Sequence, residues 1–167
     1  MKNNKLLLLL LMLYGMSLQS QVAIEKTFLD GSSILDFNTG TTKGIILPAV
    51  SIVPPTPTNG LLGFYTGDNR VYMYQNNVFV PLTEGNGSSA QITANGSAEQ
   101  GTGVIIGATT SSATGVLVLE SSTLALTLPQ VNQPHLNVKS PYPGMICYDT
   151  ASKSLAVFDG LYWNYWK

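Results

Sequence analysis

The sequence predicts an all-β protein built from two tandem, diverged copies of a small antiparallel β-meander module, packed as a sandwich-like or elongated unit. Three observations predict this class. The composition combines 44% hydrophobic with 10% charged residues and many Gly, Pro, Ser, Thr and Asn, which suits short strands joined by turns. After the first twenty residues, no long stretch has apolar residues at helical spacing. The third observation is an internal repeat.

The first twenty residues have the pattern of a secretory signal peptide. Lys2 and Lys5 give a positive start, an apolar run covers 6–13, and small residues follow up to Ser20. A membrane anchor is the alternative, but the apolar run is shorter than the roughly 20 residues that a helix needs to span a bilayer. We therefore predict a cleaved signal over 1–20, no membrane span in the mature chain, and an extracytoplasmic location: secreted, at the cell surface or in the periplasm.

The internal repeat is visible as three pairs of segments that align without internal gaps: 22–39 with 104–121, 42–48 with 123–129, and 60–82 with 144–166. Identity is low in the last pair, but its apolar positions and turn residues stay in register. Between the copies, a stretch rich in Gly, Ser and Asn has the composition of a linker, in which Ile92 could add a short strand. The predicted segments are a signal peptide (1–20), β module 1 (21–82), the linker (83–103) and β module 2 (104–167).

Each copy is expected to end in a three-stranded meander. In the second copy the predicted strands are 145–149, 154–158 and 161–166. Asp159-Gly160 is a signal for a two-residue hairpin turn, because both positions of the favoured turn need positive φ. Asn76-Asn77 occupies the same place in the first copy. The earlier half of each copy predicts two shorter strands: 34–37 and 45–47 in the first copy, and 116–119 and 124–128 in the second. The second strand of each pair is expected to end at a Leu-Pro, because proline lacks the N–H that would continue it.

No catalytic apparatus is recognisable in the sequence. His135 is the only histidine, and it lies in a loop that differs between the copies, where a surface position is expected. Cys147 is the only cysteine. It lies in an apolar run and aligns with Gly63, so we interpret it as a small buried hydrophobe rather than a nucleophile paired with His135. We predict no enzyme, with no catalytic residues, no metal site and no cofactor.

The charged residues do not indicate a catalytic carboxylate pair, a nucleic-acid-binding surface or a calcium site. Asp149 and Asp159 could face each other for glycoside hydrolysis, but both fall at turn positions where Asp is expected for backbone reasons. The formal net charge is −1, and no basic run exists beyond the N-terminus, so no nucleic-acid footprint is present. The acidic residues are scattered, which argues against a calcium cage.

The C-terminal stretch 158–166 is the richest in aromatic residues. Strand alternation divides it into two faces, with Leu161, Trp163 and Tyr165 on one and Tyr162, Asn164 and Trp166 on the other. Trp163 aligns with Phe79 and is expected to face the core. The other face is expected to make a packing or intersubunit contact, or alternatively to form an aromatic platform for sugars. The candidate ligand-binding residues are Tyr162, Trp163 and Trp166.

Several of these segments resemble a known module. The segments that show the resemblance are LDFNTGTTKGIILP at 35–48, GLLGFYT at 60–66, GMICYDT at 144–150 and FDGLYW at 158–163. Together they resemble the β-repeat modules of exported Bacteroidota (flavobacterial) proteins, whose usual form is LDxN(S/T)TTKGxxLP, then GLxxYDT, then YDGxxW. The first copy lacks the closing Trp, and neither copy has the Arg that often follows the Pro. The resemblance implies an envelope location and a structural or adhesive role.

The expected function is therefore that of an exported, non-enzymatic structural or adhesive protein of the cell envelope or surface. A carbohydrate-binding module that uses the C-terminal aromatics is the alternative. The expected partners are other envelope or surface proteins or glycans, not nucleic acid, and a homo-oligomer such as a fibre-like homotrimer stays open. Asp149-Thr150-Ala151 also resembles the O-glycosylation acceptor of such bacteria, which makes Thr150 a candidate modification site.

Overall fold

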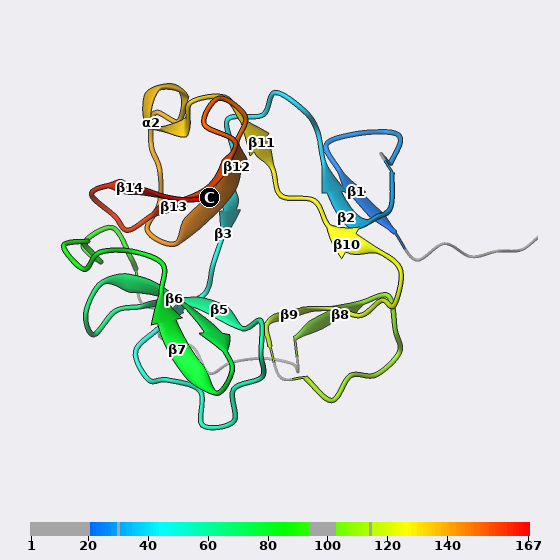
Figure 1. The fold of residues 1–167 in the computed structure, drawn as a ribbon, viewed down its shortest axis with the longest axis horizontal. Coiled ribbons are helices and arrows are strands. Elements are labelled where there is room, and N and C mark those ends of the chain that lie inside the picture. Colours follow the sequence, from blue (N-terminus) through cyan, green and yellow to red (C-terminus); the bar gives the residue numbers. More distant parts are fainter. Residues whose placement is uncertain (1–20, 30, 94–102, 114) are drawn as a thin grey trace, which may run out of the picture.

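The structure, a computed structural model, describes residues 21–29, 31–93, 103–113 and 115–167. Its regular elements are strands apart from one short helix, α2 (Pro134–Asn137), and the predicted all-β class is confirmed (Figure 1). The predicted signal peptide and the second half of the predicted linker lie outside the described residues. Among the helices of the described part, none is long and apolar enough to cross a membrane.

Each copy folds into an opening pair of strands, a link strand and a meander unit. In the first copy the opening pair is β1 (Val22–Ile24) and β2 (Ser33–Phe37), the link strand is β3 (Ile45–Ile46), and the meander unit is β4 (Ala49–Val50), β5 (Leu62–Tyr65), β6 (Arg70–Gln75) and β7 (Val78–Pro81). In the second copy the same parts are β8 (Val104–Ile106) and β9 (Leu117–Leu119), then β10 (Ala125–Leu126), then β11 (Gln130–Val131), β12 (Met145–Asp149), β13 (Ser154–Phe158) and β14 (Trp163–Trp166).

The two copies repeat their strand pairing as well as their strands. β1 is parallel to β2 with Val22 opposite Leu35, and β8 is parallel to β9 with the aligned residues Val104 and Leu117 opposite each other. The antiparallel pairs β5–β6 and β12–β13 also share one register. The internal repeat predicted from the sequence is therefore present as repeated, stacked strands.

The sheets are mixed, which the sequence did not predict. The expected antiparallel meanders are present as β5–β6–β7 and β12–β13–β14. Each meander is extended by a parallel strand, β4 beside β5 and β11 beside β12. Within the described residues the strands form four small sheets of three, five, four and two strands. These short strands stack like the turns of a solenoid rather than facing each other as two sheets of a sandwich.

The link strands pair with the other copy instead of their own. β3 lies antiparallel to β12, where the Leu47 N–H donates to the Gly144 carbonyl at 3.0 Å. β10 lies parallel to β2, with Leu126 opposite Leu35. In Figure 1 both opening pairs lie on the right and both meander units on the left, so that each copy crosses from one corner to the opposite one. The exchange joins the copies into one folded unit.

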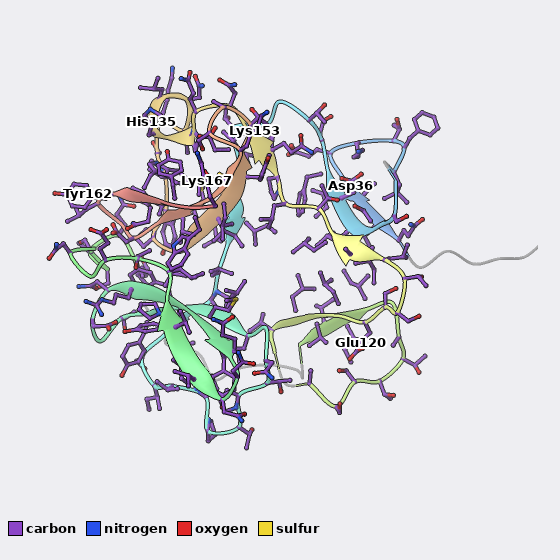
Figure 2. The ribbon with its side chains drawn as sticks, viewed as in Figure 1. Asp36, Glu120, His135, Lys153, Tyr162 and Lys167 are labelled. Atoms are coloured by element: carbon purple, nitrogen blue, oxygen red, sulfur yellow. The ribbon has the colours of Figure 1, made fainter. Side chains whose placement is uncertain are left out.

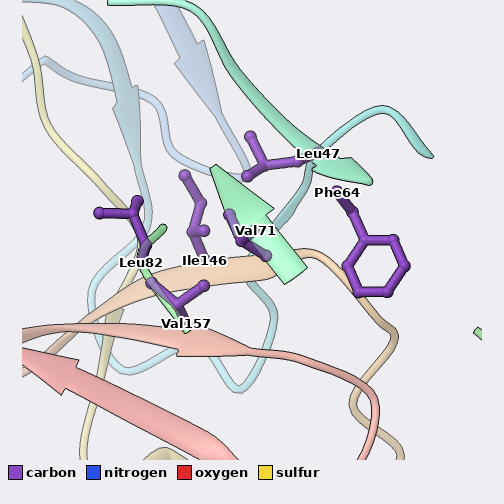
Figure 3. Packing of buried hydrophobic residues seen from close by; sticks show 6 residues of the cluster. All are labelled: Leu47, Phe64, Val71, Leu82, Ile146 and Val157. Atoms are coloured by element: carbon purple, nitrogen blue, oxygen red, sulfur yellow. The ribbon is translucent and has the colours of Figure 1, made fainter. Parts of the chain in front are cut away.

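The largest hydrophobic cluster joins the two meander units. Its buried members are Leu47, Phe64, Val71, Leu82, Ile146 and Val157 (Figure 3). The first four belong to the first copy and the last two to the second. Burial of each such side chain contributes about 1.5–3 kcal/mol, and the cluster is complete only when both copies are folded. A second cluster lies within the second copy and consists of Val131, Val138, Met145, Cys147, Ala156 and Phe158.

The hairpin turn of the first copy has the predicted form. Asn76 and Asn77 both have positive φ, at 50° and 62°, and Gln75 pairs with Val78 on either side of them. Positive φ at both central positions defines the turn type whose twist matches that of the flanking strands. Asn tolerates this conformation better than other residues with a side chain.

The corresponding turn of the second copy is displaced by one residue from the prediction. Its central residues are Gly160 and Leu161 rather than Asp159 and Gly160, because the Asp159 N–H donates to the Tyr162 carbonyl at 3.1 Å. Only Gly160 has positive φ. The buried Asp159 carboxylate accepts the N–H groups of Leu161 and Tyr162 at 2.9 and 2.7 Å. These bonds hold Asp159 at the strand end, and β14 therefore begins at Trp163.

The first half of the predicted linker is packed against both meander units. We name residues 83–93 the strap. The Ser88 N–H donates to the Asp159 carbonyl at 2.8 Å, and Ile92 packs against the large hydrophobic cluster without forming a strand. A Cβ at Gly87 would lie only 2.4 Å from the Asp159 carbonyl oxygen. A glycine-rich composition usually suggests a flexible segment. In the strap, the missing side chain of Gly87 instead allows two backbones to approach closely.

A buried ion pair distinguishes the opening pair of the first copy. Lys26 Nζ lies 2.7 Å from Asp36 Oδ2, and both side chains are almost fully buried. The aligned residues of the second copy are Ala108 and Val118. Removing one partner of a buried ion pair is costly because it leaves the other charge buried without compensation, whereas replacing both by apolar residues is often neutral or stabilising.

We predict that Asp36→Ala lowers the free energy of unfolding by about 3–5 kcal/mol, since it leaves the Lys26 charge without this carboxylate. The double variant Lys26→Ala/Asp36→Val, which copies the second module, is expected to be neutral or stabilising. Urea denaturation of both variants and the parent measures the difference. A double variant as unstable as the single one would contradict this account.

Candidate functional site

An open depression lies where the C-terminal strand β14 meets β7 and the strap. Its lining residues are Arg70, Pro81, Leu82, Thr83, Glu84, Asn86, Asp159, Tyr162, Trp163, Asn164, Tyr165 and Trp166. The three residues predicted as candidate ligand contacts, Tyr162, Trp163 and Trp166, are all among them. The chain contains two tryptophans, and both line this depression.

The aromatic side chains differ in how they are held. Trp163 is half-buried and packs on Phe158, with the ring centroids 5.3 Å apart, so that it faces the core as predicted. Tyr162 and Trp166 are 62% and 44% exposed. Figure 2 shows Tyr162 at the outer edge of the second meander unit. With Tyr165, which also lines the depression and is 40% exposed, the depression presents three exposed rings beside one ring anchored in the core.

Trp166 also ties the end of the chain to the first copy. Its indole Nε1–H donates to the Leu82 carbonyl at 2.6 Å. Leu82 is buried in the large hydrophobic cluster, so this bond links β14 to the core shared by the copies. The other half of the Trp166 surface stays open to solvent. The residue has a structural contact and an exposed face at the same time.

The strap forms the opposite wall of the depression. The Glu84 N–H donates to the Asn164 side-chain oxygen at 3.3 Å, and Asn164 Nδ2 donates to the Asp159 carboxylate at 3.1 Å. Arg70 Nη2 donates to the Glu84 carbonyl at 3.3 Å. The polar groups on this side of the depression are therefore mainly engaged in holding the strap. Sequence reasoning missed this wall, because glycine-rich composition gives no indication of what the segment packs against.

Asp149, like Asp159, serves the local backbone. Its carboxylate, 2% exposed, accepts the N–H groups of Gln133 and Ala151 at 2.9 and 3.0 Å and the Ser152 hydroxyl at 2.7 Å. Burial alone would raise the pKa of Asp149, but these hydrogen bonds outweigh it and hold the pKa below its usual range. A carboxyl group that acts as a general acid needs a raised pKa. The lowered pKa of Asp149 instead suits an anion that stabilises the turn.

Cys147 and His135 lie in different environments and have different partners. Cys147 is fully buried, and burial together with the nearby Asp149 charge raises its pKa to about 12. A thiol with that pKa stays protonated and is a poor nucleophile. His135 is exposed at the start of α2, where its Nδ1 lies 3.0 Å from the Tyr165 hydroxyl. The geometry therefore shows a histidine–tyrosine contact at the surface.

Thr150 lies at the turn that follows β12. Its N–H donates to the Val131 carbonyl at 3.0 Å, and its hydroxyl accepts from Asn132 Nδ2 at 3.3 Å. The residue is partly exposed. O-glycosylation at Thr150 stays a prediction. Among the described residues, no group of three or more His, Cys, Asp or Glu side chains is placed to hold a metal ion.

We predict that Asp149→Asn lowers the free energy of unfolding by about 1–3 kcal/mol at pH 7, because the amide cannot accept all of these hydrogen bonds. The pKa of Asp149 is lower in the folded chain than the unfolded value of about 3.9. Its contribution is therefore present above the unfolded pKa and is lost as pH falls through the folded pKa. Urea denaturation at successively lower pH should show the two proteins converging. A difference that does not change with pH would count against this role.

Neither the sequence nor the fold gives a match to a family model, a curated protein or a solved structure.

Proposed function

We propose that the mature protein is an exported, non-enzymatic structural or adhesive component of the cell envelope or surface. The observation that carries this proposal is the exchange of link strands between the copies. Separating the copies requires breaking the pairs β3–β12 and β10–β2 and opening the shared hydrophobic cluster. A small domain whose halves are interlocked in this way suits a structural role, in which the protein has to stay folded rather than catalyse a reaction.

The chemistry of the polar groups is consistent with this role. The buried carboxylates of Asp149 and Asp159 accept backbone N–H groups, and the one cysteine is held as a protonated, buried thiol. Partners would then be recognised through surface side chains. Candidates are other envelope proteins and glycans, in keeping with the resemblance of the sequence to exported surface modules.

This proposal predicts that the protein is accessible outside the cytoplasm and that its loss weakens adhesion or envelope integrity. Protease treatment should remove a surface protein from both intact and osmotically shocked cells, and a periplasmic protein from shocked cells alone, while a cytoplasmic marker survives in both. A deletion strain should lose surface attachment or become sensitive to detergent. A protein found only in the cytoplasmic fraction would refute the proposal.

A second candidate function is carbohydrate binding at the depression. The specific observation in its favour is that Tyr162, Trp163 and Trp166 line one open surface. Aromatic faces stack on the apolar faces of sugars, and polar neighbours fix the orientation of the ligand. Arg70 also lines the depression, and its guanidinium has several N–H groups that can donate.

If glycans bind here, the intrinsic tryptophan fluorescence should shift or be quenched, because both tryptophans lie at the site. Tyr162→Ala is expected to weaken binding by about tenfold or more, which corresponds to roughly 1.4 kcal/mol. Leu161→Ala, a change at the similarly exposed neighbouring residue, is the matched control and should leave binding unchanged. A glycan array without hits, together with fluorescence that no glycan changes, would leave the structural role as the sole proposal.

A further inference from the structure

Each link strand offers two hydrogen-bonding edges, because successive N–H groups along a strand point to opposite sides. The Ala125 N–H of β10 donates to the carbonyl of Ser32, just before β2, at 3.0 Å, and the N–H of Thr127, just after β10, donates to the Leu35 carbonyl of β2 at 3.1 Å. Ala125 and Thr127 align with Gly44 and Ile46 of the first copy. In the first copy the N–H of Leu47, the residue that follows Ile46 and β3, donates to the carbonyl of Gly144, just before β12, so the N–H groups of Gly44 and Ile46 point to the opposite side. The edge that β10 presents to β2 is therefore the edge that β3 turns away from β12.

β9 has an edge suited to such a strand. It is the counterpart of β2, and β8 occupies one side of it, where the Val104 N–H donates to the Val116 carbonyl at 2.8 Å. Its other side corresponds to the edge of β2 that receives β10. Within the described residues, no strand pairs with that side of β9. Val116 and Leu117 next to it are 66% and 44% exposed.

We propose that the outer edge of β9 binds the link strand β3 of a second copy of this chain. The pairing would be parallel and would repeat the contact between β10 and β2. Leu126 lies opposite Leu35 in that contact, and the aligned residues place Ile45 of one copy opposite Leu117 of the other. The chain therefore contains the template for its own association. This proposal goes beyond the envelope role above, which does not require self-association.

The side chains at the proposed contact fit each other. Ile46 of β3 is 44% exposed, so both strands offer apolar area to bury. Where the contact within the chain has a hydrogen bond between the hydroxyls of Ser33 and Thr127, the aligned pair is Gly115 and Ile46. The new contact thus replaces a polar pair by an apolar one and buries no unpaired hydroxyl.

A second copy is the favoured occupant because the internal β10 is already committed to β2. Unpaired strand edges readily template pairing with another chain. Each chain presents one receiving edge, on β9, and one donating edge, on β3. Two chains that exchange both contacts form a closed dimer, whereas contacts made in one direction form a ring or a filament.

The association is tested by light scattering of the mature full-length protein over a wide concentration range. The parent is expected to be dimeric or larger. Leu117→Lys should raise the concentration of half-association by at least about tenfold, because a charge on a strand edge opposes pairing. Leu161→Lys, at a similarly exposed leucine on the β13–β14 turn, should not. Circular dichroism and thermal unfolding confirm that both variants stay folded.

Cysteine pairing tests the register. Leu117→Cys and Ile45→Cys are made as separate variants, mixed, and oxidised, while the native Cys147 stays buried. A disulfide-linked dimer is expected from the mixture and much less from either variant alone. Four outcomes would overturn the proposal: a monomeric parent at every concentration, equal effects of the two lysine variants, no cross-link in the mixture, or an internal cross-link in a monomeric chain that carries both cysteines.

Discussion

The exchange of link strands between the copies is the constraint on which the rest of the structure depends. Because β3 pairs with β12 and β10 with β2, each copy must cross the other, and the two meander units pack against each other. That meeting creates the large hydrophobic cluster, which takes members from both copies. It also brings the end of β7 next to β14, so that the Trp166 indole reaches the Leu82 carbonyl.

Polar side chains secure the parts of the chain that the exchange leaves irregular. Asp149 organises the turn after β12, and Asp159 fixes the turn before β14 and anchors Asn164 beside the strap. Since each carboxylate satisfies several donors, neither is left to act on a ligand. The aromatic rings of the depression come from β14 and the turn before it, and its opposite wall comes from the strap.

The sequence predicted those features that depend on local pattern. The strands 145–149 and 154–158 and the Asn76-Asn77 turn follow from alternation and positive φ, and they are found as predicted. The parallel pairing and the strand exchange join segments that are far apart in the chain. The local sequence pattern does not predict which distant segments pair. The turn after β13 was wrong by one residue, because an Asp-Gly pair gives the same signal whether Asp lies in the turn or, as here, caps it from the strand end. Strand alternation placed Trp163 on the opposite face from Tyr162 and Trp166, whereas all three line one depression, and the strap beside them was not predicted.

The crossed arrangement also determines when this protein can become folded. Trp166 and Leu82 are 84 positions apart, and the first copy lacks its strand partners and part of its core until the second has been synthesised. Contacts of such long sequence separation fold slowly, and until then the first copy exposes apolar strands that are prone to mispair. A chain that must leave the cytoplasm unfolded would gain from this delay, because its own first half cannot lock prematurely. The same delay keeps the apolar strands of the nascent first copy exposed for longer.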